Sequence, residues 1–174
     1  EVVESELGHP VPDDFHDRQR AILDERLNEV QAVPGIHALL DVLDGPRCVC
    51  SNSSTPRLQL MMGKTDLWDR FEPHIWSASE VGDRKSKPDP NVYRYGMAQF
   101  QADPRETVVV EDSVFGTAAA HAAGARVIGF TGGAHAWPGL GELLTEAGAE
   151  TIVNRHADIP KVMEAFAEWD GIVD

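Results

Sequence analysis

Two carboxylates, Glu111 and Asp112, directly follow an apolar run at residues 108–110 that predicts a buried strand. Neighbouring carboxylates at such a place repel each other and lose hydration unless a cation lies beside them. Oxygen ligands of this kind suit Mg²⁺. Alternatively, one carboxylate caps the following helix and the other is solvated. Taken alone, the pair leaves the metal site and the helix cap open.

Two further polar segments could bind an anion. Residues 51–54, Ser-Asn-Ser-Ser, follow a second apolar run and offer hydroxyl and backbone N–H donors at an expected helix start. Lys87 lies in the sequence Ser-Lys-Pro-Asp-Pro, where prolines stiffen the backbone next to it. The alternatives are a simple serine helix cap for the first segment and a solvated surface charge for Lys87.

The elements that must position these residues follow from the pattern of apolar runs. Predicted strands cover residues 47–50, 108–110, 126–130 and 151–153. Predicted helices cover residues 35–43, 56–63, 90–100, 114–123, 140–147 and 159–169. Short apolar strands that alternate with helices predict an α/β fold, a doubly wound parallel sheet covered on both faces. Right-handed crossovers bring the carboxyl ends of such strands to one edge, so we expect Ser51, Lys87 and Asp112 to meet there in one cleft.

Composition narrows the class of partner. The chain has 15 Lys and Arg against 29 Asp and Glu, whereas nucleic acids and anionic membranes bind clustered positive charge. A small molecule is therefore the expected partner, and if it is an anion, a metal or a lysine must reverse the local field. The sequence contains no run of about 18 apolar residues that would predict a membrane span. Cys48 and Cys50 share one face of a predicted strand, a poor geometry for a disulfide, and we expect buried thiols.

The order of these segments resembles a known pattern. Along the chain they are residues 51–53 (Ser-Asn-Ser), 87–90 (Lys-Pro-Asp-Pro) and 111–113 (Glu-Asp-Ser), with Gly116 three residues later. This order resembles motifs two, three and four of the haloacid dehalogenase (HAD) superfamily. The likeness is to the branch that contains β-phosphoglucomutase and sugar-phosphate phosphatases, in particular the bacterial phosphatases of 6-phosphogluconate. It implies a HAD-like Rossmannoid fold with a helical cap.

The resemblance also implies a role for each motif. The implied catalytic residues are Ser51 and Lys87. The implied substrate-binding residues are Ser51, Asn52, Ser53, Lys87 and Ser113. The implied metal ligands are Glu111 and Asp112, which would hold Mg²⁺. In this chemistry an aspartate attacks phosphorus, an aspartyl-phosphate forms and water hydrolyses it, while the metal and the lysine neutralise charge.

The sequence departs from the family at the first motif, a strand followed by Asp-x-Asp. No two aspartates in this chain are separated by one residue, so the nucleophile motif is missing. Residues 1–31 resemble the last part of the family's helical cap, with an amphipathic helix expected at residues 13–30. Residues 32–174 are then the α/β core domain without its first strand. Because that strand is central in the family, we expect an unpaired gap in the sheet.

The implied function is a cytoplasmic, Mg²⁺-dependent phosphatase that hydrolyses a small phosphorylated metabolite such as 6-phosphogluconate. A phosphomutase like β-phosphoglucomutase is the nearest alternative. A catalytically inactive HAD-like binding module is a third, since the chain lacks the nucleophile. A metal-free dehalogenase fits less well, because the adjacent Glu111 and Asp112 are hard to explain without a cation.

Overall fold

The computed structural model describes residues 8–12, 14, 15, 17–19, 22, 27 and 29–170. The chain divides into two compact units, Glu1–Gln31 and Ala32–Asp174. Half of the helix expected at residues 13–30 falls outside the described residues, and within the other half residues 15, 17–19, 22 and 27 have helical backbone. The assignment of the first unit to a cap stays a prediction.

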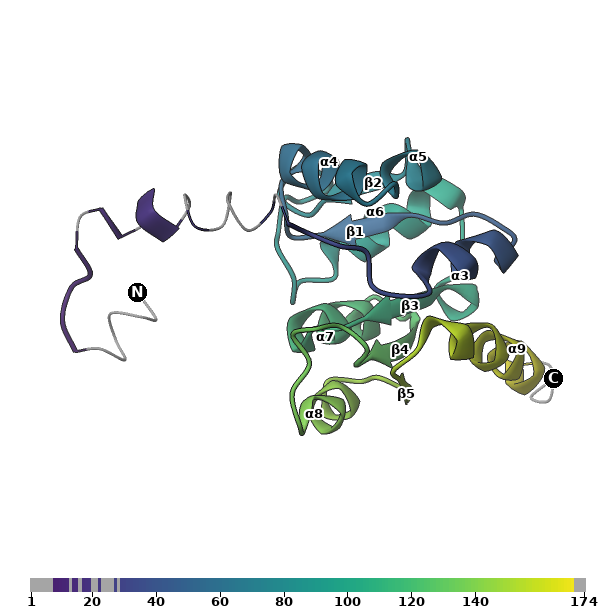
Figure 1. Ribbon diagram of the computed structural model, residues 1–174. Coiled ribbons are helices and arrows are strands. Elements are labelled where there is room, and N and C mark those ends of the chain that lie inside the picture. The colour runs from purple at the N-terminus through teal and green to yellow at the C-terminus, as the bar shows by residue number, and fades with distance from the viewer. Residues whose placement is uncertain are drawn as a thin grey trace. The chain divides into compact units, whose positions relative to one another are not determined.

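The second unit alternates strands with helices (Figure 1). Its strands are β1 (Val49–Ser51), β2 (Ile75–Ser77), β3 (Val108–Glu111), β4 (Arg126–Phe130) and β5 (Thr151–Val153). Its α-helices are α3 (Ile36–Val42), α4 (Thr55–Lys64), α5 (Trp68–Phe71), α6 (Asn91–Phe100), α7 (Val114–Ala122), α8 (Leu140–Glu146) and α9 (Ile159–Asp170). Every strand pairing among the described residues is parallel. The predicted α/β class is therefore confirmed.

The strands form two parallel sheets rather than one continuous sheet. In the first, β1 pairs with β2, with Cys50 opposite Trp76. In the second, β4 lies between β3 and β5, with Val109 opposite Val127. Within the described part of the chain, β1 and β3 therefore each pair along one edge only. Val110 of β3 is 42% exposed, so part of the apolar surface of this strand is uncovered.

Helices cover both faces of the three-stranded sheet, as the alternation along β4 shows. Val127 packs into a core cluster with Leu144 of α8. The next residue, Ile128, packs into a different cluster with Leu39 of α3 and Ile159 of α9. Successive side chains of a strand point to opposite faces, so α7 and α8 cover one face and α3 and α9 cover the other (Figure 1). This two-sided cover is the doubly wound arrangement expected from the sequence.

The strand β2 and the short helix α5 were not predicted. β2 is three residues long and ends in a serine, and α5 has four residues, so neither shows a period that a sequence pattern can reveal. β2 belongs to the sheet because Ile75 is buried against Leu58 and Met62 of α4. Tertiary packing, not local sequence preference, forms these two elements.

The two cysteines are free thiols, and they are half-buried where buried thiols were expected. Their Sγ atoms lie 3.9 Å apart, and the Sγ of Cys50 is 3.5 Å from the carbonyl oxygen of Val92 in α6. The hydrogen bond with Cys48 and burial both raise the pKa of the Cys50 thiol. Cys50 therefore stays protonated and packs as an apolar side chain between β1 and α6.

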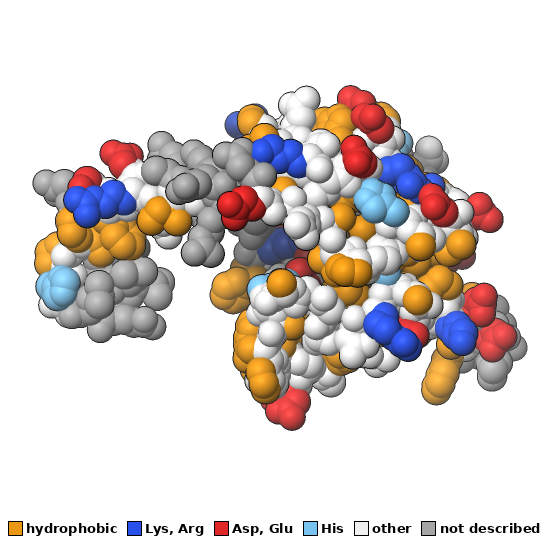
Figure 2. Space-filling model, in the orientation of Figure 1, with side chains coloured by type: hydrophobic (Ala, Val, Ile, Leu, Met, Phe, Trp, Pro, Cys, Tyr) orange, Lys and Arg blue, Asp and Glu red, His pale blue; other side chains and the backbone are white. Residues whose placement is uncertain are grey.

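Charge is distributed over the surface without a basic patch on the face shown in Figure 2, where acidic and basic side chains of the second unit are interspersed. The net formal charge is −14. No helix among the described residues combines the length and the apolar character that a membrane span requires.

Candidate active site

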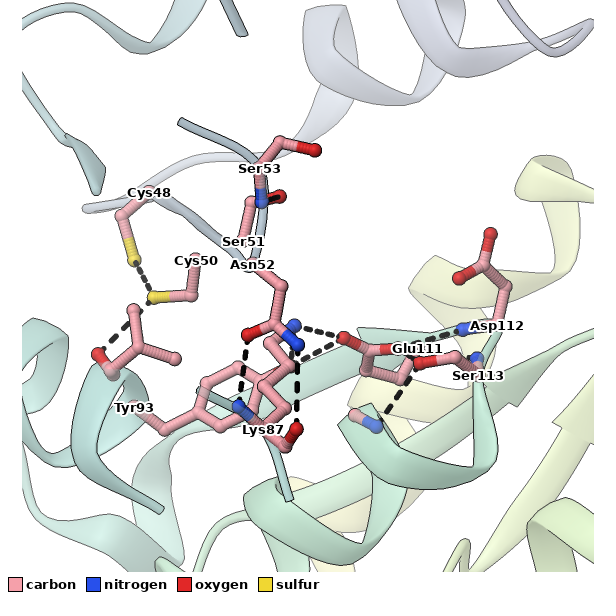
Figure 3. Close-up of polar contacts among 12 residues, drawn as sticks. Cys48, Cys50, Ser51, Asn52, Ser53, Lys87, Tyr93, Glu111, Asp112 and Ser113 are labelled. Carbon is pink, nitrogen blue, oxygen red and sulfur yellow. Dashed lines mark hydrogen bonds and ion pairs between the residues drawn. The ribbon is translucent and has the colours of Figure 1, made fainter. Parts of the chain in front are cut away.

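The site lies where β1 and β3 end (Figure 3). The loop between β2 and α6 contains Lys87, which contacts residues at both of these strand ends. Directly after β1, the side-chain oxygen of Asn52 accepts a 2.9 Å hydrogen bond from the backbone N–H of Lys87. The side-chain amide of Asn52 donates a hydrogen bond to the backbone carbonyl oxygen of Lys87 at 3.4 Å. The Lys87 ammonium forms an ion pair with Glu111 at the end of β3. The structure thus brings three of the predicted segments together at one edge.

Glu111 is the centre of a buried hydrogen-bond cluster. Its Oε1 accepts from the Nζ of Lys87 and, at 2.6 Å, from the hydroxyl of Tyr93. Its Oε2 accepts from the backbone N–H groups of Asp112 and Ser113, both at 3.2 Å, and from the Ser113 hydroxyl at 2.9 Å. The side chains of Lys87 and Glu111 are only 8% and 9% exposed. The ion pair is therefore shielded from water, and each oxygen of Glu111 also accepts at least one hydrogen bond from a neutral group.

The electrostatics of this cluster keep Glu111 ionised. Burial alone would raise its pKa, but the charge and hydrogen bond of Lys87, with the hydroxyl hydrogen bonds of Tyr93 and Ser113, together hold the pKa below the usual value. Burial, and then the nearby charge of Glu111, raise the pKa of Tyr93. Tyr93 is therefore a neutral donor to Glu111, and its oxygen accepts a 2.7 Å hydrogen bond from Lys87.

The start of helix α7 is built around Glu111. Ser113 is the N-cap: its hydroxyl oxygen accepts from the N–H of Gly116 at 3.0 Å and its hydroxyl hydrogen is donated to Glu111. A Cβ atom on Gly116 would lie 2.1 Å from the carboxyl carbon of Glu111, so only glycine lets the first turn approach this closely. Since Ser113 caps the helix, neither Glu111 nor Asp112 is the cap. The Ser113 hydroxyl already donates to Glu111 and accepts from Gly116. These contacts favour a role for Ser113 in positioning Glu111, rather than the expected role in binding substrate.

Asp112 has a different environment from Glu111. Its side chain points away from the Glu111 cluster (Figure 3) and is 52% exposed. Its Oδ2 lies 3.5 Å from the Nε2 of His135, in the loop between β4 and α8. A solvent-facing carboxylate can serve a hard cation as an oxygen ligand, so Asp112 fits Mg²⁺.

The two expected metal ligands differ in their surroundings. Both oxygens of Glu111 accept hydrogen bonds from protein donors, whereas the Asp112 carboxylate is half-exposed. No group of three or more His, Cys, Asp or Glu side chains that could hold a metal ion occurs among the described residues. A cation at Asp112 would therefore take most of its ligands from water, from a phosphoryl group or from groups outside the described part of the chain.

The serines after β1 form a tight turn before α4. The Ser51 hydroxyl oxygen accepts from the N–H of Ser53 at 3.1 Å, which leaves its hydrogen for an external acceptor. At the first residue of α4, Thr55, the N–H and the hydroxyl both donate to Glu80, at 3.0 and 2.6 Å. A carboxylate of the protein therefore already occupies the start of this helix. The start of the helix is therefore excluded from the expected anion site, which then consists of Ser51, Asn52 and Ser53.

Two residues of the site were not predicted from the sequence, Tyr93 and His135. A signal existed for each. Tyr93 lies on the buried face of α6, and a buried tyrosine hydroxyl requires a hydrogen-bond partner. His135 follows a predicted strand and the pair Gly132-Gly133, so it lies at the sheet edge where ligands bind in this fold class.

Comparison with known proteins places the chain among related hydrolases. The sequence model of the family described as haloacid dehalogenase-like hydrolase matches residues 3–130. The 6-phosphogluconate phosphatase of Escherichia coli K12 is 29% identical over 111 residues, which are 64% of this chain and 49% of that protein. The chain thus spans about half the length of this curated relative.

Solved structures are similar over more of the chain. A haloacid dehalogenase-like protein of unknown function from Agrobacterium tumefaciens is 45% identical with a TM-score of 0.89, over 95% of this chain and 75% of that one. A HAD family hydrolase from Deinococcus radiodurans, solved with bound phosphate and sodium, is 29% identical with a TM-score of 0.81, over 95% of this chain and 73% of that one. The fold expected from the motifs is the fold of these proteins.

Proposed function

Because the chain belongs to the haloacid dehalogenase-like hydrolase family, we propose that it forms the phosphate-binding and metal-binding part of a phosphatase acting on a small phosphomonoester. The observation that carries the proposal is Lys87. Its ammonium is buried at the carboxyl edge of the strands, and two of its three N–H donors are directed to Tyr93 and Glu111. The third donor is left for a phosphoryl oxygen.

The phosphoryl group would lie between Lys87 and the turn after β1. The Ser51 hydroxyl can donate to a phosphoryl oxygen, because its own oxygen already accepts from Ser53. Asn52 uses its side chain to hold the backbone of Lys87, so it fixes the distance between the turn and the lysine. Preorganised donors of this kind are what phosphoryl transfer requires of a protein.

Mg²⁺ is the proposed cofactor, with Asp112 as its protein ligand. When bound, a divalent cation neutralises negative charge on the phosphoryl oxygens. Asp112 supports this role because its carboxylate is exposed and points away from Glu111. The net charge of the protein does not oppose substrate binding, since Mg²⁺ and Lys87 set the local field.

The nucleophile is the part that the sequence does not contain. Among the described residues, β1 and β3 each pair along one edge only, and Val110 of β3 is 42% exposed. We propose that a further parallel strand pairs there and brings an aspartate to the site for attack on phosphorus, giving an aspartyl-phosphate that water hydrolyses. The name of the Escherichia coli relative supports a sugar phosphate such as 6-phosphogluconate as the substrate.

The test uses two proteins, the 174-residue chain and the same chain preceded by a strand that ends in Asp-x-Asp. With Mg²⁺, the second protein should release phosphate from members of a sugar phosphate panel that includes 6-phosphogluconate. Lys87→Gln should abolish release. Lys85→Gln should not, because Lys85 is 62% exposed and lies 3.6 Å from Asp89.

The outcomes separate the candidate functions. Phosphate release from a sugar monophosphate supports the phosphatase. Conversion of one sugar phosphate isomer into another, without release, would indicate the mutase. If a folded protein with the added strand binds inorganic phosphate but turns over none of the panel, the inactive binding module is the better description.

A further inference from the structure

A histidine faces the proposed metal ligand from a separate part of the fold. His135 lies in the loop between β4 and α8, 23 residues from Asp112 in sequence. Its Nε2 is 3.5 Å from the Oδ2 of Asp112 and also 3.5 Å from the backbone carbonyl oxygen of Asp112, and the two side chains are 53% and 52% exposed. Imidazole and carboxylate thus present one nitrogen and one oxygen to the same region of solvent, at the carboxyl edge of the sheet.

We propose that Asp112 and His135 together form a two-residue site for a borderline divalent cation of the Mn²⁺, Co²⁺ or Ni²⁺ class. The inference deepens the proposed function, on which it rests, because it adds His135 as a second protein ligand at the Asp112 site and names the class of cation that this ligand favours. Carboxylate oxygen alone suits Mg²⁺, whereas imidazole nitrogen is a ligand for the later first-row metals. The added histidine would therefore shift selectivity away from Mg²⁺.

The distance between the two ligand atoms is compatible with a shared ion. Metal bonds of about 2.1 Å to nitrogen and to oxygen allow two ligand atoms to lie at most about 4.2 Å apart. The observed Nε2 to Oδ2 separation of 3.5 Å corresponds to an angle of about 113° at a cation bound to both. The separation of the two atoms is therefore within the range that one bound ion allows.

The loop is built to bring His135 to this position. A Cβ atom on Gly133 would lie 2.7 Å from the Cε1 of His135, and one on Gly132 would lie 2.3 Å from the carbonyl oxygen of Asn154. Side chains at these two positions would collide with the imidazole or with the backbone after β5. The two glycines thus let the loop fold closely enough for the ring to face Asp112.

The alternative is a hydrogen bond between His135 and Asp112 with no metal role. The variant His135→Gln separates the two possibilities. Its amide N–H can still donate to Asp112 from about the position of Nε2, but an amide is a poor ligand for Co²⁺. His121→Gln is the matched control, because His121 is exposed in the last turn of α7, whereas the site is at the first turn.

The experiment measures the binding of Mg²⁺ and Co²⁺ to the 174-residue chain by titration calorimetry at pH 7.5, in a buffer that does not bind metals. Proton NMR of the histidine rings gives a second readout, since paramagnetic Co²⁺ should shift or broaden the His135 signals. We expect Co²⁺ to bind more tightly than Mg²⁺. His135→Gln should weaken Co²⁺ by about tenfold or more and Mg²⁺ by less than about twofold, and His121→Gln should change neither.

The outcomes separate this inference from the proposed function. If wild type binds both cations, Asp112→Asn weakens both and His135→Gln weakens neither, the histidine is no ligand and the inference fails while the metal role of Asp112 stands. If Asp112→Asn leaves Mg²⁺ and Co²⁺ binding unchanged, or wild type binds neither ion, the proposed metal site and the inference both fail.

Discussion

The hydroxyl of Tyr93 donates a 2.6 Å hydrogen bond to the carboxylate of Glu111, and this contact joins the two halves of the second unit. Tyr93 belongs to α6, which packs against β1 and β2, whereas Glu111 ends β3 of the other sheet. Lys87 contacts both residues, so the contact helps to set the position of Lys87 relative to both sheets.

Removal of the Tyr93 hydroxyl should therefore destabilise the protein. Tyr93→Phe keeps the ring and deletes one hydrogen bond to a buried charge, so the free energy of unfolding should fall by about 1.5–3 kcal/mol. Urea unfolding followed by circular dichroism measures the change. Tyr95→Phe is the control on the same helix: its ring packs against Trp76, and the expected change is within about 0.5 kcal/mol. Equal effects of the two variants would contradict a special role for Tyr93.

Neutralisation of Glu111 should reveal the cost of an unpaired buried lysine. Glu111→Gln keeps the shape of the side chain but leaves Lys87 without its counter-ion, and the expected loss of stability at pH 7 is about 3–5 kcal/mol. Glu111→Gln with Lys87→Met removes both charges, so this double variant should recover part of the loss. A double variant as unstable as the sum of the two single variants would mean that the pair does not interact.

The same pair predicts the pH dependence of stability. The folded-state pKa of Glu111 lies below its usual value, so its contribution is complete above the unfolded pKa of about 4.3 and is lost as the pH falls through the lowered folded value. From about pH 5 downward, wild type should lose more stability than Glu111→Gln does. Urea unfolding at several pH values tests this, and parallel curves for the two proteins would contradict it.

Much of this fold could be predicted from the sequence, because local patterns determine most of its elements. The run at residues 108–110 has no polar interruption and indicates β3 directly. The role of Glu111 could not be predicted in the same way. Its partners Lys87 and Tyr93 are 24 and 18 residues away in sequence, and only the folded chain brings them to one point.

The motifs nevertheless predicted that these segments would meet at the carboxyl edge of the strands. Because the carboxyl ends of parallel strands lie at one edge, Asn52 and Glu111 were both expected at that edge. Sequence order could not show that the side chain of Asn52 holds the backbone of Lys87, 35 residues away. For the same reason the different surroundings of Glu111 and Asp112, adjacent in sequence, could not be predicted: the Glu111 side chain is 9% exposed and that of Asp112 is 52% exposed.

Gly116 should be among the least replaceable residues of the site. Because a Cβ atom there would lie 2.1 Å from the Glu111 carboxyl carbon, Gly116→Ala must displace either the carboxylate or the first turn of α7. Alanine normally stabilises a helix relative to glycine by about 1 kcal/mol, so a net loss of stability would show that the collision outweighs helix preference. Gly63→Ala in α4, where nothing lies within 4 Å of the added atom, should show the ordinary stabilisation.

Asp112→Asn tests the proposed metal site through stability as well as activity. The change replaces an exposed carboxylate by an amide of the same shape, and the helix cap is Ser113, so without metal the free energy of unfolding should stay the same or rise slightly as repulsion with Glu111 is relieved. Wild type should gain stability from Mg²⁺ by mass action, about 2.7 kcal/mol at 100 times the dissociation constant. The variant should gain none.

The measurement is the shift of the thermal unfolding midpoint with Mg²⁺ concentration, run for the 174-residue chain and for the chain with an added Asp-x-Asp strand. In the second protein Asp112→Asn should also abolish phosphate release, because both effects depend on the same ligand. Asp89→Asn controls for a general loss of acidic charge, since Asp89 pairs with the exposed Lys85. If Asp112→Asn retains both the Mg²⁺-induced shift and normal turnover, Asp112 does not bind the metal, and the mechanism that relies on it is wrong.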